Sequence, residues 1–531
     1  MLSFYQDPAF WKQTLHLILP WFFAATLSAG PIVLDESQAA SNQSGFVLAS
    51  PEGAAPIFVD ADDSKTVHLA ARLFAGDVAR VAGQLPELTL QRDAAAPAAA
   101  EGVVIVGSLE GSRLIQDLVA HQRIDPAAIA GEWESCLIEV VDQPFAGVGR
   151  ALVIAGSDRR GTAYGLLEIS RQMGVSPWHF FADVPPTQRE HVVLRRDRVI
   201  QGPPSVKYRG IFINDEMWGL RPWARFTHAP AEGKGLGPQT HARIFELLLR
   251  LKANTLWPAM HQQTRPFYFY QANAEVADAY GIVIGTSHIE PMLRNNIRGA
   301  EWDQVRPGEP WNYVENRASI YDYWEERVKE VGQYENIYTL GKRGQDDVAG
   351  DEITVSVLEQ IFGDQREILR RWVHPDLSRV PQVLIPYTEV LDLYNQGLDV
   401  PEDVIICWPD DNFGYIRQLP DQAEQQRPGG SGIYYHFQWL NGATTAYPWL
   451  HTTPPALTWT EMRKAYAHHA RELWIVNVGD IKPAEIGIEH FMQMAWDIES
   501  LAENDPHAFF VDWARRDFGP QHSQRIARVL D

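Results

Sequence analysis

The sequence predicts an α/β protein in which a small α/β domain precedes a (β/α)8 TIM barrel. With 531 residues, the chain is long for one ordinary domain. Apolar runs alternate with helical stretches over the first 200 residues. After residue 204, eight apolar, β-branched runs follow one another, with room for a helix in seven of the intervals. We therefore expect a small domain at 30–200, a barrel at 205–510 and the start of a helical region at 511–531.

The first 29 residues are expected to form a secretory signal peptide. Leu15–Ala29 is apolar and ends in small residues, and a polar segment with the glycosylation sequon Asn42-Gln43-Ser44 follows it. Against this interpretation, the preceding region contains Asp7 and only one lysine. The apolar stretch is short for a bilayer span. We expect a secreted, extracellular protein with no membrane span in the mature chain.

Two strands and a helix are predicted within the small domain. The runs 102–107 (GVVIVG) and 151–156 (ALVIAG) predict the strands, and Gly161–Met173 predicts the helix. Gly156–Thr162 is spaced like a phosphate-binding loop, but it lacks the lysine that would contact phosphates. We interpret it as a strand-to-helix turn. The alanine-rich stretch Asp93–Ala100 is expected to be a surface loop.

Eight runs after Pro203 and Pro204 predict the barrel strands. They are Tyr208–Ile213, Asn254–Trp257, Ile282–Gly285, Ile337–Leu340, Gln382–Pro386, Val404–Trp408, Ile433–Phe437 and Leu473–Val476. The best helical pattern between them is Thr240–Lys252. Its apolar face holds Ile244, Leu247, Leu248 and Leu251, whereas Arg243, Glu246 and Arg250 lie elsewhere on the helix. We expect this helix to cover the outside of the barrel.

Polar side chains follow the barrel strands at the end where the active sites of such barrels lie. A single carboxylate there is most simply a helix cap or a loop hydrogen-bond acceptor. Acidic groups follow the first, fourth, fifth, sixth and eighth runs, and their mutual repulsion would raise at least one pKa, as a general acid requires. The candidate residues are Asn214, Glu216, Trp257, His288, Arg343, Asp346, Asp347, Glu389, Asp410, His436 and Asn477.

The cationic and imidazole groups among these acids have two interpretations each. His288 and His436 either orient carboxylates or donate hydrogen bonds to substrate hydroxyls. Arg343 either pairs with a substrate carboxylate or neutralises Asp347, and Lys482 adds further positive charge. The first strand is not followed by the H-x-H arrangement of metal-dependent barrel hydrolases, so no metal site is expected.

Charge and cysteine content narrow the class of protein. Lys and Arg total 46 against 68 Asp and Glu, and the formal net charge of -22 makes nucleic acid a poor partner. Cys136 and Cys407 are the only two cysteines, so a disulfide framework is not expected. The 18 Trp, 18 Tyr and 22 Phe suit the flat apolar faces of sugars, although most of these rings should lie in the core.

Six motifs resemble glycoside hydrolase family 115, the xylan α-1,2-glucuronidases. They are RGIFINDEMWGLRPWA from Arg209, LKANTLWPAM from Leu251, GTSHIEPMLRN from Gly285, GKRGQDD from Gly341, PYTEVLDLYNQGLDVPEDVIICWPDDNFGYIRQLP from Pro386 and YYHFQWLNG from Tyr434. The resemblance implies removal of glucuronic acid or its 4-O-methyl ether from xylose units, with inversion and without a cofactor. It also implies a small domain similar to the one that precedes hexosaminidase barrels.

The same resemblance implies roles for individual residues. It implicates Glu216, Asp347 or its neighbour Asp346, Glu389 and Asp410 as the acids, and His436 as a substrate contact. An inverting glycosidase needs an acid and a base whose carboxyl groups lie roughly 6.5 to 9.5 Å apart. We predict Asp347 as the acid and Glu389 as the base, with Asp410 as a reserve base and Glu216 holding sugar hydroxyls.

Two alternative functions stay open. One is another exo-acting barrel glycosidase, such as a substrate-assisted hexosaminidase, whose substrate needs no cationic clamp. The other is a truncated, inactive carbohydrate-binding protein, because family members continue past the barrel whereas this sequence stops at Asp531. The expected partner is glucuronoxylan or its oligosaccharides. We expect a homodimer only for a form that carries the family's C-terminal domains.

Overall fold

Eight parallel strands form the central barrel, and the predicted TIM-barrel fold is confirmed. The structure is a computed structural model that describes residues 32–35, 38, 45–92, 100–214, 216–438, 451–503 and 505–531. The barrel strands are β10 (Tyr208–Phe212), β11 (Thr255–Trp257), β12 (Val283–Ile284), β13 (Tyr338–Thr339), β14 (Gln382–Leu384), β15 (Ile405–Pro409), β16 (Ser431–His436) and β17 (Ala470–Asn477). They pair in the order β12-β11-β10-β17-β16-β15-β14-β13. A parallel bridge between Ile284 and Asn336 joins β12 to the segment before β13.

Side chains alternate between the inside of the barrel and the surrounding helices, as the pleat of a strand requires. One apolar cluster contains the inward residues, such as Phe212, Trp257 and Tyr434. A second cluster contains residues of alternate positions, such as Ile211 and Leu256, together with the helices. This alternation decides which residues at the strand ends can face a substrate in the barrel mouth.

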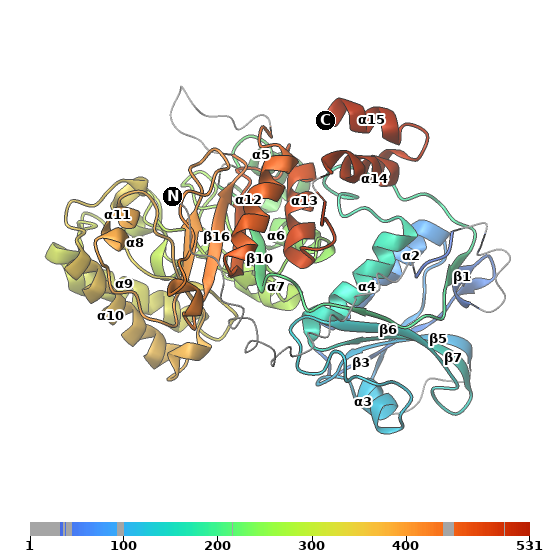
Figure 1. The fold of residues 1–531 in the computed structure, drawn as a ribbon. Coiled ribbons are helices and arrows are strands. Elements are labelled where there is room, and N and C mark those ends of the chain that lie inside the picture. The colour runs from blue at the N-terminus through green and yellow to red at the C-terminus, as the bar shows by residue number, and fades with distance from the viewer. Residues whose placement is uncertain are drawn as a thin grey trace, which may run out of the picture. The chain divides into compact units, whose positions relative to one another are not determined.

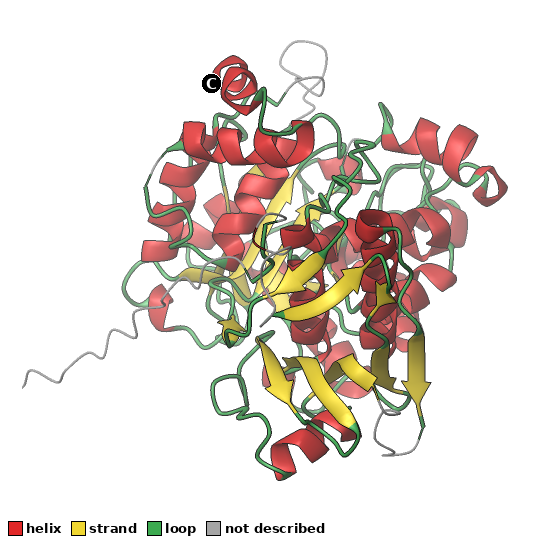
Figure 2. Cartoon of the chain, turned by 90° about the vertical axis from the view of Figure 1, so that its right-hand side faces the viewer, coloured by secondary structure: helices red, strands yellow, loops and turns green. Residues whose placement is uncertain are grey.

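Helices surround the barrel strands (Figure 2). They are α5 (Leu220–Trp223), α6 (Pro238–Arg250), α7 (Ala272–Tyr280), α8 (Glu301–Val305), α9 (Tyr313–Val331), α10 (Val355–Trp372), α11 (Glu389–Asn395), α12 (Pro455–Ala467) and α13 (Glu485–Trp496). Helix α6 matches the helix predicted at 240–252, and its predicted apolar face is buried. Glu246 and Arg250 are buried as well, because Arg250 donates hydrogen bonds to Asp77 of the N-terminal part as well as to Glu246.

The N-terminal part contains a mixed sheet with the order β4-β3-β5-β7-β6-β9. Its strands are β3 (Ile57–Asp60), β4 (Leu88–Gln91), β5 (Ala100–Ser108), β6 (Cys136–Asp142), β7 (Val148–Gly156) and β9 (Val199–Gln201). Helices α2 (Lys65–Ala82) and α4 (Arg159–Met173) cover one face, and α3 (Arg113–Ala120) covers the other (Figure 1). A smaller antiparallel sheet contains β1 (Phe46–Ser50), β2 (Gly53–Ala54) and β8 (Val192–Leu194).

The segment from Gly156 to Thr162 is the strand-to-helix turn that the sequence predicted. It connects β7 to α4, and Asp158 Oδ1 accepts the backbone N–H groups of Arg160 (2.9 Å) and Gly161 (2.8 Å). The N–H groups that a phosphate would need are therefore already used by the protein.

Several predictions concern parts of the chain outside the described residues. These parts include the signal peptide at 1–29, the sequon at 42–44 and positions 93–99 of the alanine-rich loop. No helix in the described part of the chain is long and apolar enough to cross a membrane. Cys136 and Cys407 are both buried and free.

The last two helices, α14 (Pro506–Phe518) and α15 (Ser523–Leu530), follow the barrel. Phe509 and Phe510 pack with Ala527 in a small apolar cluster of their own. Arg516 of α14 pairs with Glu489 of α13, which attaches this segment to the barrel. Residues 32–531 form one compact unit that contains both the N-terminal part and the barrel.

Candidate active site

Arg343 lies at the centre of the candidate site and contacts both predicted catalytic carboxylates. It follows β13 and its side chain is almost fully buried. Its Nε and Nη2 donate to the two carboxylate oxygens of Glu389, at 2.7 and 2.6 Å, and Nη2 also donates to Thr388 Oγ1 at 2.8 Å. Nη1 donates to Asp347 Oδ1. One guanidinium therefore holds the carboxylates that follow two adjacent strands, β13 and β14.

The backbone after β13 separates Asp347 from Asp346. Both residues have positive φ angles, 63° and 60°, a conformation that non-glycine residues rarely adopt. Asp347 Oδ1 lies 2.9 Å from His288 Nε2, in addition to its contact with Arg343. Asp346 instead accepts from Arg298 Nε at 2.9 Å, and Arg298 is an exposed residue. Asp347 therefore belongs to the Arg343 site, whereas Asp346 does not contact it.

The charges around Arg343 keep both carboxylates ionised in the ligand-free protein. Burial by itself would raise the pKa of Asp347, but His288 and Arg343 outweigh it, and the pKa is lowered. Burial likewise would raise the pKa of Glu389, and hydrogen bonds from Arg343 and Thr388 lower it overall. A carboxylate of this kind can accept a proton, and it can donate one only after its pKa has been raised.

Asp410 and His436 form a buried pair beside this site. His436 Nδ1 lies 2.5 Å from Asp410 Oδ1, and Gly414 N–H donates to Asp410 Oδ2 at 2.9 Å. Both side chains are almost completely buried. Because its two oxygens are already occupied, Asp410 is better placed to orient His436 than to activate a water molecule.

Two tyrosines that the sequence analysis did not select lie between the histidines. The Tyr387 ring lies 4.3 Å from His288, and the Tyr434 ring lies 4.4 Å from His436. Asn477 Nδ2 donates to Tyr434 Oη at 3.1 Å. Burial raises the pKa of Tyr387 to about 12, so its hydroxyl stays protonated. The strand alternation could have indicated these residues, because both occupy inward positions at strand ends.

Several buried polar atoms near the strand ends have no hydrogen-bond partner within the described chain. They are Asn214 Oδ1, Trp257 Nε1, His288 Nδ1 and both amide atoms of Gln438. A buried group left unpaired costs about 1 to 3 kcal/mol, so such groups favour a polar ligand or water. Gln438 was not selected from the sequence. It lies two residues after His436, and strand alternation places both residues on the inward side.

The other residues predicted at the strand ends have partners of their own. Glu216 is fully buried and accepts a hydrogen bond from Thr264 Oγ1. Asp480 accepts the backbone N–H groups of Gly219 and Leu220, which fixes the loop after Glu216. Lys482 is exposed, and its Nζ lies 3.9 Å from Glu485 Oε1. Within the described residues, no group of three or more His, Cys, Asp or Glu side chains could hold a metal ion.

Acidic side chains grouped at the carboxyl ends of a TIM barrel are typical of glycoside hydrolases. A family model described as "Glycosyl hydrolase family 115" matches residues 201–531. The chain therefore belongs to glycosyl hydrolase family 115. A comparison with curated proteins gave no match.

Solved structures agree with this family and with the fold. One is described as a family GH115 4-O-methyl-alpha-glucuronidase with specificity for decorated arabinogalactans. It is 42% identical with a TM-score of 0.82, and the match covers 91% of this chain and 62% of that one. The chain thus spans less than two thirds of that relative. The GH20 beta-N-acetylhexosaminidase from Streptomyces coelicolor A3(2) is 11% identical, with a TM-score of 0.52 over 91% of this chain and 94% of that one. That likeness concerns the fold alone.

Proposed function

We propose that this protein is a glycoside hydrolase that releases glucuronic acid or 4-O-methylglucuronic acid side groups from a decorated plant polysaccharide. The observation that carries the proposal is the shared contact of Arg343 with Asp347 and Glu389. Glucuronoxylan is the substrate that the sequence predicts. Decorated arabinogalactan is the second candidate, because it is the substrate named for the related solved enzyme.

The proposed reaction is a single displacement with inversion. Glu389, which is ionised and only partly buried, accepts a proton from the attacking water. Asp347 protonates the departing oxygen of the polysaccharide. Water and leaving group then lie on opposite faces of the sugar, so the product is released as the β-anomer when the substrate bond is α.

The acid role of Asp347 requires a rise in its pKa, and an anionic substrate supplies a physical cause. A uronate carboxylate close to Arg343 adds negative charge beside Asp347 and competes for the guanidinium. Both effects raise the pKa of Asp347 and favour its protonated form in the complex. A neutral sugar would leave the Arg343 contact intact, which gives the site a preference for uronic acids.

The buried polar groups have a complementary role in this proposal. Asp410 fixes the ring orientation of His436, so that its second ring nitrogen remains for a sugar hydroxyl. Asn214 Oδ1 and His288 Nδ1, which lack partners in the described structure, are suited to the same task. Such contacts orient the ring without taking part in proton transfer.

The test uses the purified chain and four substrates: glucuronoxylan, decorated arabinogalactan, an aryl α-glucuronide and an aryl N-acetylglucosaminide. We expect uronic acid release from at least one polysaccharide and from the aryl glucuronide, with the β-anomer seen first by proton NMR. Release of N-acetylglucosamine alone would select the hexosaminidase alternative. Binding to polysaccharide without any release would select the inactive carbohydrate-binding protein. Initial formation of the α-anomer would reject inversion.

A further inference from the structure

Most of the exposed aromatic rings lie in segments that follow barrel strands. The largely exposed Trp, Phe and Tyr side chains of the described chain are Trp218, Phe226, Phe269, Trp372, Phe413, Tyr415 and Phe518. Five of these seven lie in the segments that follow β10, β11 and β15, at the same strand ends as the candidate active site. Exposed rings cost solvation free energy, so a group of them beside a site indicates a binding surface.

Phe413 and Tyr415 stand out because the loop that carries them is held in place. Asp411 Oδ1 accepts the backbone N–H groups of both residues at 3.1 Å. Asp411 N–H donates to Tyr415 O at 3.0 Å, and Asp410 forms an antiparallel bridge with Ile416. The rings are 53% and 45% exposed on this hydrogen-bonded loop. A surface that is already ordered loses less conformational entropy on binding.

The same loop is continuous with the active site. Gly414 N–H donates to Asp410 Oδ2, the carboxylate that orients His436. Tyr387 Oη donates to Asn412 Oδ1 at 3.0 Å, and the Tyr387 ring packs on His288. A molecule bound on the two rings would therefore lie next to the sugar that the site holds.

The chemistry of the loop favours a neutral, ring-shaped partner. Arg417 Nε and Nη2 donate to Asp411 Oδ2 at 2.8 and 2.6 Å, so the charges next to the rings cancel. The Arg417 guanidinium also lies 5.1 Å from the Tyr415 ring. Aromatic faces beside polar groups suit sugar rings, which present apolar C–H faces and hydroxyl edges.

We propose that Phe413 and Tyr415 form an aromatic platform that binds neutral main-chain sugars of the polysaccharide next to the one that carries the uronic acid. This proposal rests on the proposed function for the identity of the side group. The platform makes the enzyme selective for a polymer over a small glucuronide. The ligand is a chain of neutral pyranose rings. Xylan and galactan main chains both have this chemistry.

The kinetic test compares the wild-type chain with the double variant Phe413→Ala, Tyr415→Ala. We expect the ratio of kcat/KM for the polysaccharide to kcat/KM for the aryl glucuronide to fall about tenfold, which corresponds to roughly 1.4 kcal/mol of lost contact. The double variant Phe413→Tyr, Tyr415→Phe keeps both rings and should keep the ratio. An unchanged ratio in the alanine variant would overturn the platform.

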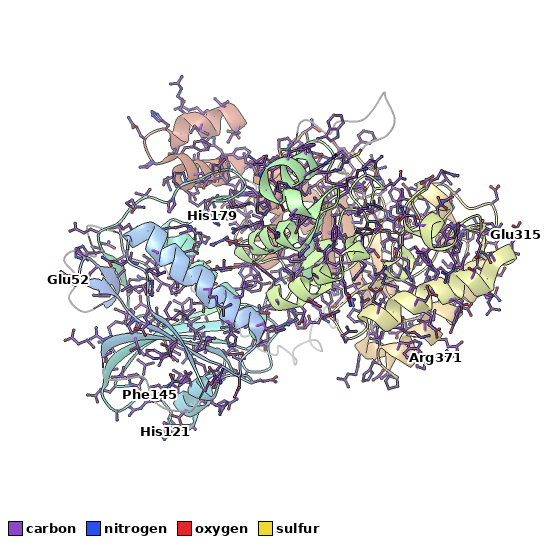
Figure 3. All side chains as sticks on the ribbon, turned by 180° about the vertical axis from the view of Figure 1, so that it is seen from behind. Glu52, His121, Phe145, His179, Glu315 and Arg371 are labelled. Atoms are coloured by element: carbon purple, nitrogen blue, oxygen red, sulfur yellow. The ribbon has the colours of Figure 1, made fainter. Side chains whose placement is uncertain are left out.

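Trp372→Ala is the matched control. Trp372 is similarly exposed, at 43%, but it lies at the C-terminal end of α10, before the start of β14 rather than after the end of a strand. Its neighbour Arg371 lies on the outside of the molecule (Figure 3). We expect Trp372→Ala to leave the ratio unchanged.

A binding test separates this proposal from the proposed function. Native gels that contain unsubstituted xylan or galactan should retard the wild-type chain and the ring-keeping variant in one of the two gels, and retard the alanine variant less. Ring-dependent retardation in a chain that releases no uronic acid would support the platform while rejecting the hydrolase. Uronic acid release with equal mobility of all variants in both gels would support the hydrolase and reject the platform.

Discussion

Asp346 and Asp347 are neighbours in the chain, yet only Asp347 contacts His288 and Arg343. The role of Asp347 as the acid can therefore be tested with substrates whose leaving groups differ in their need for a proton. We expect Asp347→Ala to lose most activity on polysaccharide, whose leaving alcohol needs a proton, and to keep far more on an aryl glucuronide, whose phenolate departs unaided. Initial rates on both substrates provide the measurement.

Two matched variants complete this test. Asp346→Ala removes a carboxylate that pairs with Arg298 and should lower both rates by less than about tenfold. Glu389→Ala should lose activity on both substrates, and added azide should restore part of it by replacing the activated water. Equal losses by Asp347→Ala on both substrates would remove it as the acid and move attention to Asp346 or Glu216.

Glu290 shows how a buried carboxyl outside the reaction can affect stability. Burial raises its pKa to about 8, and Asn295 Nδ2 donates to Glu290 Oε1 at 2.7 Å. Because the folded pKa lies above the unfolded one, Glu290 favours folding below the unfolded pKa, and this contribution is lost as the pH rises through about 8. Glu290→Gln stays neutral and should therefore become more stable than the wild type as the pH rises.

Urea unfolding at pH 5 and pH 9 measures this effect. One unit of pKa shift corresponds to about 1.4 kcal/mol, so the difference in unfolding free energy between variant and wild type should change by a few kcal/mol over this range. The exposed Glu367, which pairs with Arg371, supplies the control Glu367→Gln. A pH-independent difference between Glu290→Gln and the wild type would show that Glu290 does not titrate in this range.

At the scale of elements, hydrophobic periodicity was sufficient to predict the eight strands and helix α6. It could not predict that Glu246 and Arg250 would be buried, because their partner Asp77 lies 173 residues away from Arg250 in the sequence. The strand-end positions of Asp347 and Glu389 followed from the barrel pattern, but their common contact with Arg343 depends on loop conformation. Asp346 and Asp347 have positive φ angles, but neither is a glycine, so the sequence does not indicate this backbone conformation.

Helices α2 and α6 are joined by the buried pair of Asp77 and Arg250. Arg250 Nη1 and Nη2 donate to Asp77 at 2.8 and 3.1 Å, and both side chains are nearly inaccessible. We expect Asp77→Asn to lower the free energy of unfolding by about 3 kcal/mol, because the buried guanidinium of Arg250 would lose one of its two charge partners and keep only Glu246. The control is Asp142→Asn, which removes the exposed pairs with Arg150 and Arg196 and should cost less than about 1 kcal/mol. Equal losses in urea unfolding would contradict the importance of burial.

At the scale of the whole molecule, the N-terminal part and the barrel share one apolar core. Tyr164, Leu167 and Trp178 from the N-terminal part belong to the same cluster as the outward residues of the barrel strands. Glu134 adds a buried polar link, because it accepts from Arg160 and from the barrel residues Arg209 and Asn254. Two bodies joined only by a linker would share neither feature.

This shared core predicts that the two parts unfold together. Hydrogen exchange followed by mass spectrometry should give peptides from β5 and β16 the same denaturant midpoint, because neither part keeps its core when the other opens. Glu134→Gln weakens the charge contacts of both Arg160 and Arg209, so it should lower both midpoints by the same amount. Exposed Glu367→Gln should lower neither. A lower midpoint for β5 peptides alone in Glu134→Gln would mean that the N-terminal sheet unfolds independently, and that the Glu134 contacts stabilise its attachment rather than a common core.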